Sequence, residues 1–258
     1  MKRILFTSLL PKELKRNEIF CVKDQVESLI DLGYEVDITI ASAHRNSLEE
    51  VEKILPDNAK LLLFSAEDPT TFLRLNPELQ WQTRRFEIIP GKELLRHHGN
   101  LYEGDFVFYT DSDQWISKDS LKACIEHMTS DKLIDVVRMP VGFREPGGPD
   151  GCGPQRLSTQ TYSFSLYLIK PILLGLTENM VTLSNLDKAK TGLGELYAPD
   201  NTFFHKLLSI GAVSKNYDAA HTRHYVTENE YWRVKDGIVD YIGGQPKKEV
   251  TFLKSLNI

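Results

Sequence analysis

The stretch that decides the fold is DFVFYTDSDQWIS, residues 105–117. It opens with four consecutive β-branched or aromatic residues that begin at Phe106. Such an unbroken run predicts a central parallel strand that is covered on both of its faces. Asp111 and Asp113 follow at the carboxyl end of this strand, which is where open α/β sheets bind their ligands. We therefore expect the two acids to face a crevice rather than open solvent.

Two carboxylates one residue apart offer hard oxygen ligands that suit Mg²⁺ or Mn²⁺. Such ions keep open positions for the oxygens of a diphosphate. The alternative for Asp111 and Asp113 is an ordinary turn after a strand, because Asp and Ser are common turn residues. The apolar run before the pair favours the ligand site. A helix is expected next, with Ser117 as its N-cap.

Composition bounds the class of protein. The chain has 258 residues, enough for one large domain or two small ones, and its 41% hydrophobic and 26% charged residues are normal for a globular protein. The formal net charge of −5 argues against a nucleic-acid binder that works through a basic surface. No run approaches the ~20 apolar residues of a membrane span, and the start reads as a strand rather than a signal peptide. We expect a cytoplasmic protein, with peripheral membrane association left open.

The cysteines give no sign of a disulfide framework or a zinc site. Cys21, Cys124 and Cys152 are an odd number and have no C-x-x-C spacing. They are expected to be reduced thiols in a reducing compartment.

The rest of the chain alternates strands and helices. A strand, a helix ended by Gly33 and a second strand form a βαβ unit, which implies a parallel sheet. Ser47 with Glu50 three residues later has the pattern of a capping box that opens a second helix. The third strand, at residues 60–65, is expected to be buried. The predicted strands are residues 4–10, 34–41, 60–65, 105–110, 133–139 and 212–216, and the predicted helices are 18–32, 47–55, 80–100, 117–128 and 177–189. Residues 161–174 begin with strand-like alternation and are expected to end as a strand or the entry to a helix around Pro171.

Two later segments carry further signals. Residues 141–156 hold five glycines and three prolines, which exclude a helix or a central strand. This loop is either a functional lid or a surface insertion. Asp200 precedes an amphipathic helix, NTFFHKLLSI, that Gly211 closes, so it is a candidate N-cap or a functional acid.

The order of these features resembles the GT-A fold glycosyltransferases, nearest to the inverting family-two type. Residues 91–113, GKELLRHHGNLYEGDFVFYTDSD, resemble that family's G-x-x-x-x-R-x-x-G segment that leads into a strand and D-x-D. Residues 198–212, APDNTFFHKLLSIGA, resemble its acid-opened helix that ends in glycine. The resemblance covers roughly residues 4–224 as an ordered pattern, with little residue identity.

The resemblance implies a single-domain α/β protein with a GT-A, Rossmann-like fold. Such a fold has a mostly parallel central sheet with helices on both faces. Residues 1–116 would form the nucleotide-sugar-binding half, residues 117–224 the acceptor half, and residues 225–258 a C-terminal extension.

It also implies a metal-dependent glycosyltransferase that moves a sugar from a nucleotide diphosphate sugar to a hydroxyl acceptor, with inversion. The acceptor would be a glycan, a glycolipid or a protein-linked sugar. Bound Mn²⁺ or Mg²⁺ would act as a Lewis acid on the leaving diphosphate. Asp113 would hold the metal, and Asp111 would face the donor's hydroxyls or reach the metal, directly or through water. A late histidine would complete the metal shell, with His221 preferred to His224.

The donor would also contact residues elsewhere in the chain. Thr7 and Ser8 end the first strand, where the family binds the base and ribose, and Ser112 lies between the two acids. Arg96 would reach the donor's phosphate or sugar, or else lie on a solvated helix face. The family usually has Pro-x-x-Asn after strand one and an Asp pair after strand two, but this chain has TSLLPKE and IASAHR. The identity of the nucleotide is therefore left open.

Inversion needs a base that takes the proton of the acceptor hydroxyl during attack. Asp200 is the first candidate and Glu195 the second. A retaining transferase on the same fold would need no such base. A nucleotidyltransferase normally has a glycine-rich, basic signature after strand one, and TSLLPKELKR has no glycine. A nucleotide-sugar-binding protein without turnover is the non-enzyme alternative.

Overall fold

The computed structural model describes the central part of the fold and the segments that pack on it. These are residues 2–14, 16–66, 74, 85–112, 114–138, 166–175, 203, 207, 210–216, 222–223, 232–235 and 238–241.

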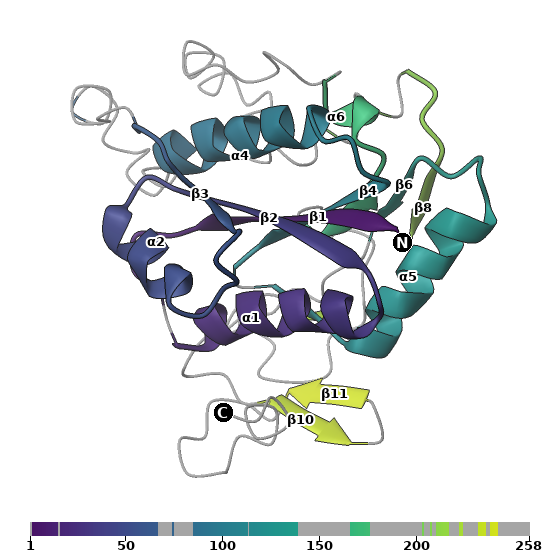
Figure 1. Ribbon diagram of the computed structural model, residues 1–258, viewed down its shortest axis with the longest axis horizontal. Coiled ribbons are helices and arrows are strands. Elements are labelled where there is room, and N and C mark those ends of the chain that lie inside the picture. The colour runs from purple at the N-terminus through teal and green to yellow at the C-terminus, as the bar shows by residue number, and fades with distance from the viewer. Residues whose placement is uncertain are drawn as a thin grey trace.

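A seven-stranded sheet with the order β3-β2-β1-β4-β7-β6-β8 forms the centre of the molecule (Figure 1). Strands β3, β2, β1 and β4 pair in parallel, β7 runs antiparallel to β4 and β6, and β8 runs parallel to β6. Only β7 therefore opposes the others within this sheet. The strands are β1 (Arg3–Leu10), β2 (Glu35–Ser42), β3 (Lys60–Leu63), β4 (Phe106–Asp111), β6 (Val136–Arg138), β7 (Tyr167–Ile169) and β8 (Ser214–Asn216).

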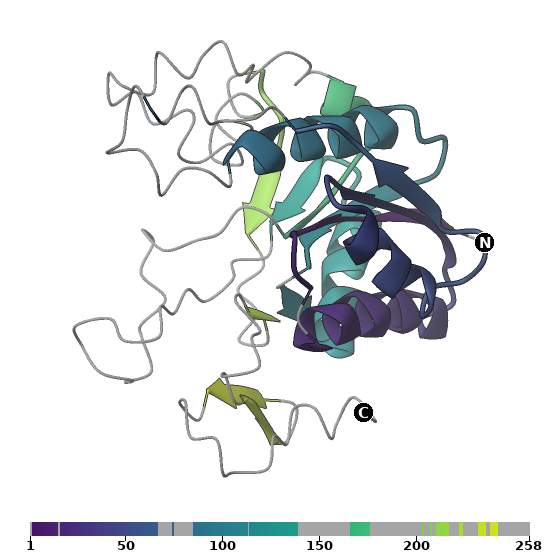
Figure 2. The same cartoon turned by 90° about the vertical axis from the view of Figure 1, so that its left-hand side faces the viewer.

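Helices cover both faces of this sheet (Figures 1 and 2). Helices α1 (Arg16–Asp31), α2 (Arg45–Glu52) and α5 (Lys118–Ser130) pack on one face, and α4 (Arg85–Asn100) and α6 (Ile172–Gly175) pack on the other. The predicted α/β fold, with a mostly parallel central sheet between helices, is confirmed. Two small antiparallel pairs lie outside the sheet, β5 (Trp115–Ile116) with β9 (Thr222–Arg223) and β10 (Trp232–Lys235) with β11 (Ile238–Tyr241).

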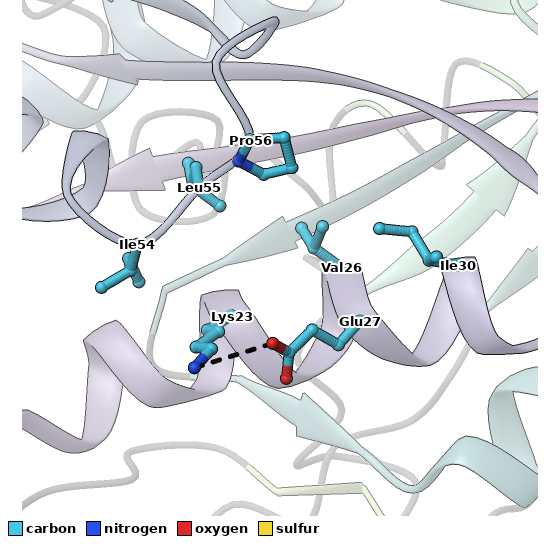
Figure 3. A pocket seen from close by; sticks show the side chains of 7 residues that line it. All are labelled: Lys23, Val26, Glu27, Ile30, Ile54, Leu55 and Pro56. Atoms are coloured by element: carbon cyan, nitrogen blue, oxygen red, sulfur yellow. Dashed lines mark ion pairs between the residues drawn. The ribbon is translucent and has the colours of Figure 1, made fainter.

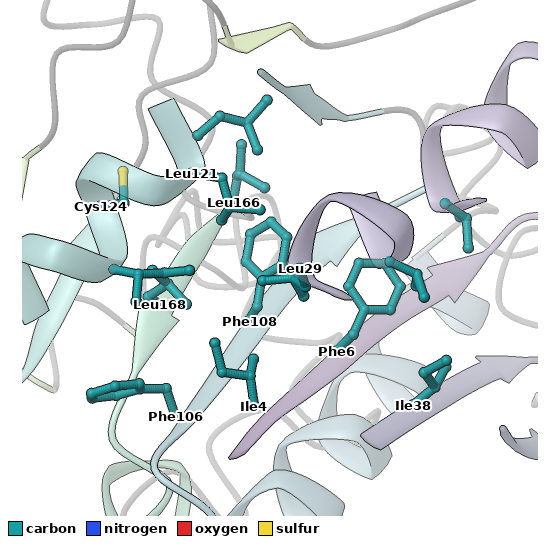
Figure 4. Close-up of a cluster of buried hydrophobic side chains, with 14 of the residues drawn as sticks. Ile4, Phe6, Leu29, Ile38, Phe106, Phe108, Leu121, Cys124, Leu166 and Leu168 are labelled. Carbon is teal, nitrogen blue, oxygen red and sulfur yellow. The ribbon is translucent and has the colours of Figure 1, made fainter. Parts of the chain in front are cut away.

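The strands β1 and β4 are buried on both faces, as their apolar runs predict. Ile4 and Phe6 of β1 point into the core under α1 and α5, while Leu5 and Leu9 point into the core under α4. Phe6 packs edge to face on Phe108 of β4, with ring centroids 5.8 Å apart (Figure 4). Burial of such side chains stabilises the sheet by roughly 1.5–3 kcal/mol each.

Several local signals are confirmed. Gly33 follows α1 with a positive φ of 85°, as the end of a helix requires, and Gly211 also has a positive φ, 82°. Ser117 is the N-cap of α5, and its hydroxyl accepts a hydrogen bond from the amide of Ser120. Cys21 and Cys124 are free thiols and are buried. No helix in the described part of the chain is long and apolar enough to cross a membrane.

Two local predictions are wrong. Helix α2 begins at Arg45 with His44 as its N-cap, so Ser47 does not open a capping box. The Ser47 hydroxyl lies instead 2.7 Å from the carbonyl oxygen of Pro11 and 3.0 Å from that of Lys12. Strand β3 is an edge strand whose first and last residues are exposed, and not a fully buried strand, because only β2 pairs with it. The predicted loop at 141–156 lies outside the described residues.

Candidate functional site

The candidate site lies where the strand order of the sheet reverses. The chain runs from β1 outward to β2 and β3, and then returns to β4 on the other side of β1. The carboxyl ends of β1 and β4 are neighbours there, with Leu9 opposite Asp111. Open α/β sheets bind ligands at such a switch point, because the loops leave the two strands in opposite directions and open a crevice. Asp111 is therefore positioned as the sequence predicts.

One row of register partners crosses the sheet close to this edge, on the face that α4 covers. The row is polar or aromatic at every position, although most of the surrounding sheet is aliphatic. Its members are Lys60, Thr39, Thr7, Tyr109, Tyr167, Arg138 and Asn216.

The centre of this row is a stack of two tyrosines. The rings of Tyr109 and Tyr167 are 4.8 Å apart and inclined by 7°. Phe203 packs on Tyr167 at 5.6 Å. All three side chains are fully buried, so Tyr109, Tyr167 and Phe203 form an aromatic floor beneath α4.

Two glycines let α4 lie close to this floor. A Cβ on Gly91 would collide with Leu9 of β1 and would lie 2.8 Å from Cζ of Phe64. A Cβ on Gly99 would collide with Leu174 of α6. The glycines of the G-x-x-x-x-R-x-x-G segment are therefore explained by close packing of α4 on the sheet and on α6.

Close packing brings two cations of α4 over the aromatic floor. Nζ of Lys92 lies 3.1 Å from Oδ2 of Asp111, and the two side chains are 5% and 23% exposed. Arg96, one turn later, is also buried. Its guanidinium lies 4.6 Å from the ring centroid of Phe203 and 5.9 Å from that of Tyr109. A spacing of four residues places both cations on one face of the helix.

The D-x-D turn is anchored from the other face of the sheet. The amide of Gln114 donates to the carbonyl oxygen of Asp111 at 3.1 Å, and the Gln114 side chain accepts from the Asp111 amide at 3.4 Å. Gln25 of α1 donates to the carbonyl oxygen of Gln114 at 2.9 Å. Gln25 and Gln114 are fully buried, so this turn is held by protein groups and not by solvent.

The other residues that were predicted to bind the sugar donor lie near this edge and differ in their surroundings. Thr7 and Ser8 are fully buried on opposite faces of β1, and their hydroxyl oxygens have no hydrogen-bond partner among the described residues. Ser112 is also buried. Arg96 lies under Phe203 and not on a solvated helix face. Five predicted site residues lie outside the described residues: Asp113, Glu195, Asp200, His221 and His224.

Three residues of this region were not predicted from the sequence. Lys92 precedes Arg96 by four residues, and this spacing is a signal that it shares the buried face. Gln25 interrupts the apolar stripe of Val22, Val26 and Leu29, which marks a polar side chain that needs a partner inside the protein. Arg138 ends β6 beside Tyr167, and burial lowers the pKa of its guanidinium.

The described residues do not by themselves form a metal site. Within them, no group of three or more His, Cys, Asp or Glu side chains is arranged to hold an ion. The carboxylate at the end of β4, Asp111, is paired through Oδ2 with Lys92. Further ligands would have to come from Asp113 and a histidine of the late segment.

A separate pocket lies away from this edge (Figure 3). It has a volume of about 220 Å³ and lies between α1 and the segment after α2. None of the candidate site residues lines it. The lining residues are Lys23, Val26, Glu27, Ile30, Ile54, Leu55 and Pro56.

No protein-family model and no curated protein matches this chain. Among solved structures, it is similar to glucosyl-3-phosphoglycerate synthase from Mycobacterium tuberculosis, in complex with Mg²⁺ and uridine-diphosphate. The identity is 12%, over 86% of this chain and 71% of that one, with a TM-score of 0.48. It is also similar to the mannosyltransferase PcManGT from Pyrobaculum calidifontis, in complex with GDP-Man and Mn²⁺, with 12% identity over 99% and 61% of the chains and a TM-score of 0.48.

A third similar structure is the bifunctional IspDF from Campylobacter jejuni, with 13% identity over 85% of this chain and a TM-score of 0.45. This chain spans 50% of the length of IspDF and 61% of that of the mannosyltransferase. The function proposed below rests on the residues of the site and not on these similarities.

Proposed function

We propose that this protein is a glycosyltransferase that moves a sugar from a nucleotide diphosphate sugar to a hydroxyl acceptor. The observation that carries the proposal is the position of Asp111, the first acid of the D-x-D. It lies at the switch point between β1 and β4, partly exposed and paired with the buried Lys92. A nucleotide bound at this switch point would place its diphosphate beside Asp111.

The pairing of β5 with β9 supports a role for the late histidines. Trp115 pairs with Arg223, and Ile116 pairs with Thr222. Trp115 comes two residues after Asp113, and Arg223 comes directly before His224. The backbone of the late segment therefore runs beside the end of the D-x-D turn. This register favours His224 over His221 as the histidine that would join Asp113 at a Mn²⁺ or Mg²⁺ ion.

The contact between Arg96 and Phe203 supports a role for Asp200. Phe203 follows Asp200 by three residues, and its ring packs on Arg96 and on Tyr167 of the aromatic floor. Phe203 thus contacts the helix that carries Lys92 and Arg96, three residues after the predicted base in the sequence. We propose that Asp200 takes the proton of the acceptor hydroxyl as its oxygen attacks the anomeric carbon, and that the nucleoside diphosphate leaves from the opposite face. Glu195 is the second candidate for this base.

The first test is binding of the donor, measured as a shift of the melting temperature. The protein is heated with UDP-, GDP-, dTDP- and CMP-sugars, each with Mn²⁺ and each with EDTA. A ligand that binds only the folded state stabilises it, by about 2.7 kcal/mol at 100 times its Kd. We expect a shift with one class of diphosphate sugar, larger with Mn²⁺. CMP-sugars have no diphosphate and are the matched control.

Variants connect the shift to the site. Asp113→Ala and Asp111→Asn should reduce the shift strongly, while Glu49→Gln on the exposed side of α2 should leave it unchanged. Once the donor is known, the anomeric configuration of the product separates inversion from retention. Asp200→Asn should then lower turnover and leave the donor shift intact. If no nucleotide sugar shifts the melting temperature under either condition, the proposal is wrong.

A further inference from the structure

Lys92 is held in place as a fixed charge beside Asp111. Its side chain is 5% exposed, and its Nζ lies 3.1 Å from Oδ2 of Asp111 and 6.0 Å from the ring centroid of Tyr109. The preceding residue, Gly91, packs too closely on Leu9 and Phe64 for α4 to shift toward the sheet. The ammonium is therefore buried beside Asp111, unlike a surface lysine that exchanges partners with solvent.

The two members of this ion pair differ in their exposure to solvent. A buried ammonium is stable only when an opposite charge and hydrogen-bond acceptors accompany it, and Asp111 supplies both. The Asp111 side chain is 23% exposed, whereas that of Lys92 is 5% exposed. Oδ1 of Asp111 is buried, so a cation that arrives from solvent would have to approach through Oδ2, the oxygen that Lys92 pairs with.

We propose that Lys92 and a divalent cation compete for the carboxylate of Asp111, and that Lys92 thereby sets how strongly the donor site depends on metal. This inference rests on the proposed function in that it places the diphosphate beside Asp111. A divalent ion on Asp111 would lie a few ångströms from the ammonium, and like charges at this distance repel strongly in a partly buried site. Because Lys92 and the cation bind the same carboxylate, a change that weakens the binding of one to Asp111 strengthens the binding of the other.

The same ion pair has the opposite effect on a diphosphate when no metal is present. An unpaired carboxylate at this position would repel the phosphate oxygens. With Lys92 beside it the pair is close to neutral, so a diphosphate can bind without a metal bridge. Removal of the Lys92 charge should therefore strengthen the binding of metal alone and weaken metal-free binding of a nucleoside diphosphate.

Calorimetric titrations of the full chain test both directions. The probes are Mn²⁺ alone, and UDP and GDP in EDTA. The variants are Lys92→Gln, Lys92→Met, Lys92→Arg and Asp111→Asn. For Lys92→Gln we expect Mn²⁺ to bind about tenfold or more tightly and the diphosphate to bind more weakly by a similar factor. Lys92→Arg keeps the charge and should stay within about threefold of the wild type in both titrations. Asp111→Asn should lose most Mn²⁺ binding.

The glutamine variant guards against loss of the fold, because its amide can still donate to Asp111, whereas methionine has no such donor. Circular dichroism of each variant checks that it is folded. Unchanged or weaker Mn²⁺ binding in Lys92→Gln, or no Mn²⁺ binding in any variant, would overturn the inference. Nucleotide binding that does not change in the Lys92 variants would contradict this inference and leave the proposed function intact. The expected effect on Mn²⁺ binding, together with no nucleotide binding, would support the competition at Asp111 and contradict the proposed function.

Discussion

Buried polar side chains decide how the D-x-D turn is held. Gln25 reaches from α1 to the carbonyl oxygen of Gln114, and its amide also donates to the Cys21 carbonyl oxygen at 3.2 Å. Gln114 in turn bonds both the amide and the carbonyl of Asp111. The position of the first acid therefore depends on a residue 86 positions earlier in the chain, on the face of the sheet opposite α4.

The substitution Gln25→Leu tests this anchor. It keeps the size of the side chain but leaves the buried carbonyl oxygen of Gln114 without this donor. We expect the free energy of unfolding to fall by about 1–3 kcal/mol, measured by urea unfolding, and the melting shift with the donor to shrink. Glu27→Gln, exposed on the same helix, should change the free energy of unfolding by less than about 0.5 kcal/mol. Full retention of the donor shift would show that the turn does not need Gln25.

Single residues were predictable where the signal is local. Asp111 follows directly from the apolar run before it, and the Ser117 cap follows from the helix pattern after it. Lys92 and Gln25 contact Asp111 and Gln114 only after helices pack on the sheet. These contacts therefore could not be predicted from a local sequence pattern. Ser47 shows the reverse case. Its local pattern fits a capping box, but in the folded chain its hydroxyl lies within hydrogen-bonding distance of the carbonyl oxygens of Pro11 and Lys12.

Among the elements, β6, β7 and β8 depend on one carboxylate at the start of β6. Asp135 accepts from Nζ of Lys170 at 2.8 Å through Oδ1 and from the amide of Val213 at 2.9 Å through Oδ2. Burial alone would raise the pKa of Asp135. The hydrogen bonds from Lys170 and Val213 and the charge of Lys170 outweigh it and hold the pKa below its ordinary value. The carboxylate of Asp135, with Lys170 and the amide of Val213, therefore joins the ends of the three short strands, and we call this group the clasp.

The clasp makes a pH-dependent contribution to stability. Because the pKa of Asp135 is depressed in the folded state, its contribution is present above the ordinary aspartate pKa of about 4 and is lost as pH falls through the folded pKa. We expect Asp135→Asn to lower the free energy of unfolding by about 1–3 kcal/mol at pH 7 and by much less at pH 3. Urea unfolding at both pH values measures this, with Asp57→Asn in an exposed turn as control. An equal loss at both pH values would contradict the clasp.

Element positions followed from the sequence where strands and helices are long. The predicted first, second and fourth strands of the sheet and α5 agree with the structure to within one or two residues. Strand β3 was expected to be buried because KLLLFS is apolar. Strand β3 lies at the edge because of the order of strands in the sheet, and this order cannot be predicted from the residues of one strand.

The whole described molecule is organised by one continuous sheet. Strand β4 pairs with β1 on one side and with β7 on the other, so the predicted nucleotide-binding and acceptor halves share hydrogen bonds and an aromatic core. The order of motifs in the sequence predicted such an α/β arrangement. The reversal of β7 and the depth of Thr7, Ser8 and Arg96 could not be predicted, because they arise from pairings between distant segments.

A shared sheet predicts a single unfolding transition for the molecule. Urea curves from far-UV circular dichroism and from tryptophan fluorescence should coincide and give the same midpoint. The physical reason is that separating the halves would expose both Tyr109 and Tyr167 together with the hydrogen-bonding edge of β4. Two separate transitions would mean that the halves fold independently and that the single-domain prediction is wrong.

The late position of β7 in the chain has a consequence for synthesis on the ribosome. Strands β1, β2, β3 and β4 emerge before β7 and can pair with one another, but β7 is not made until after β6. At ~5–20 residues per second, the far edge of β4 is exposed for several seconds on the nascent chain. Strand β4 contains Phe106, Phe108 and Tyr109, and an aromatic strand with an unpaired edge is a template for aggregation. Chaperone demand during translation should therefore peak in the interval between β4 and β7.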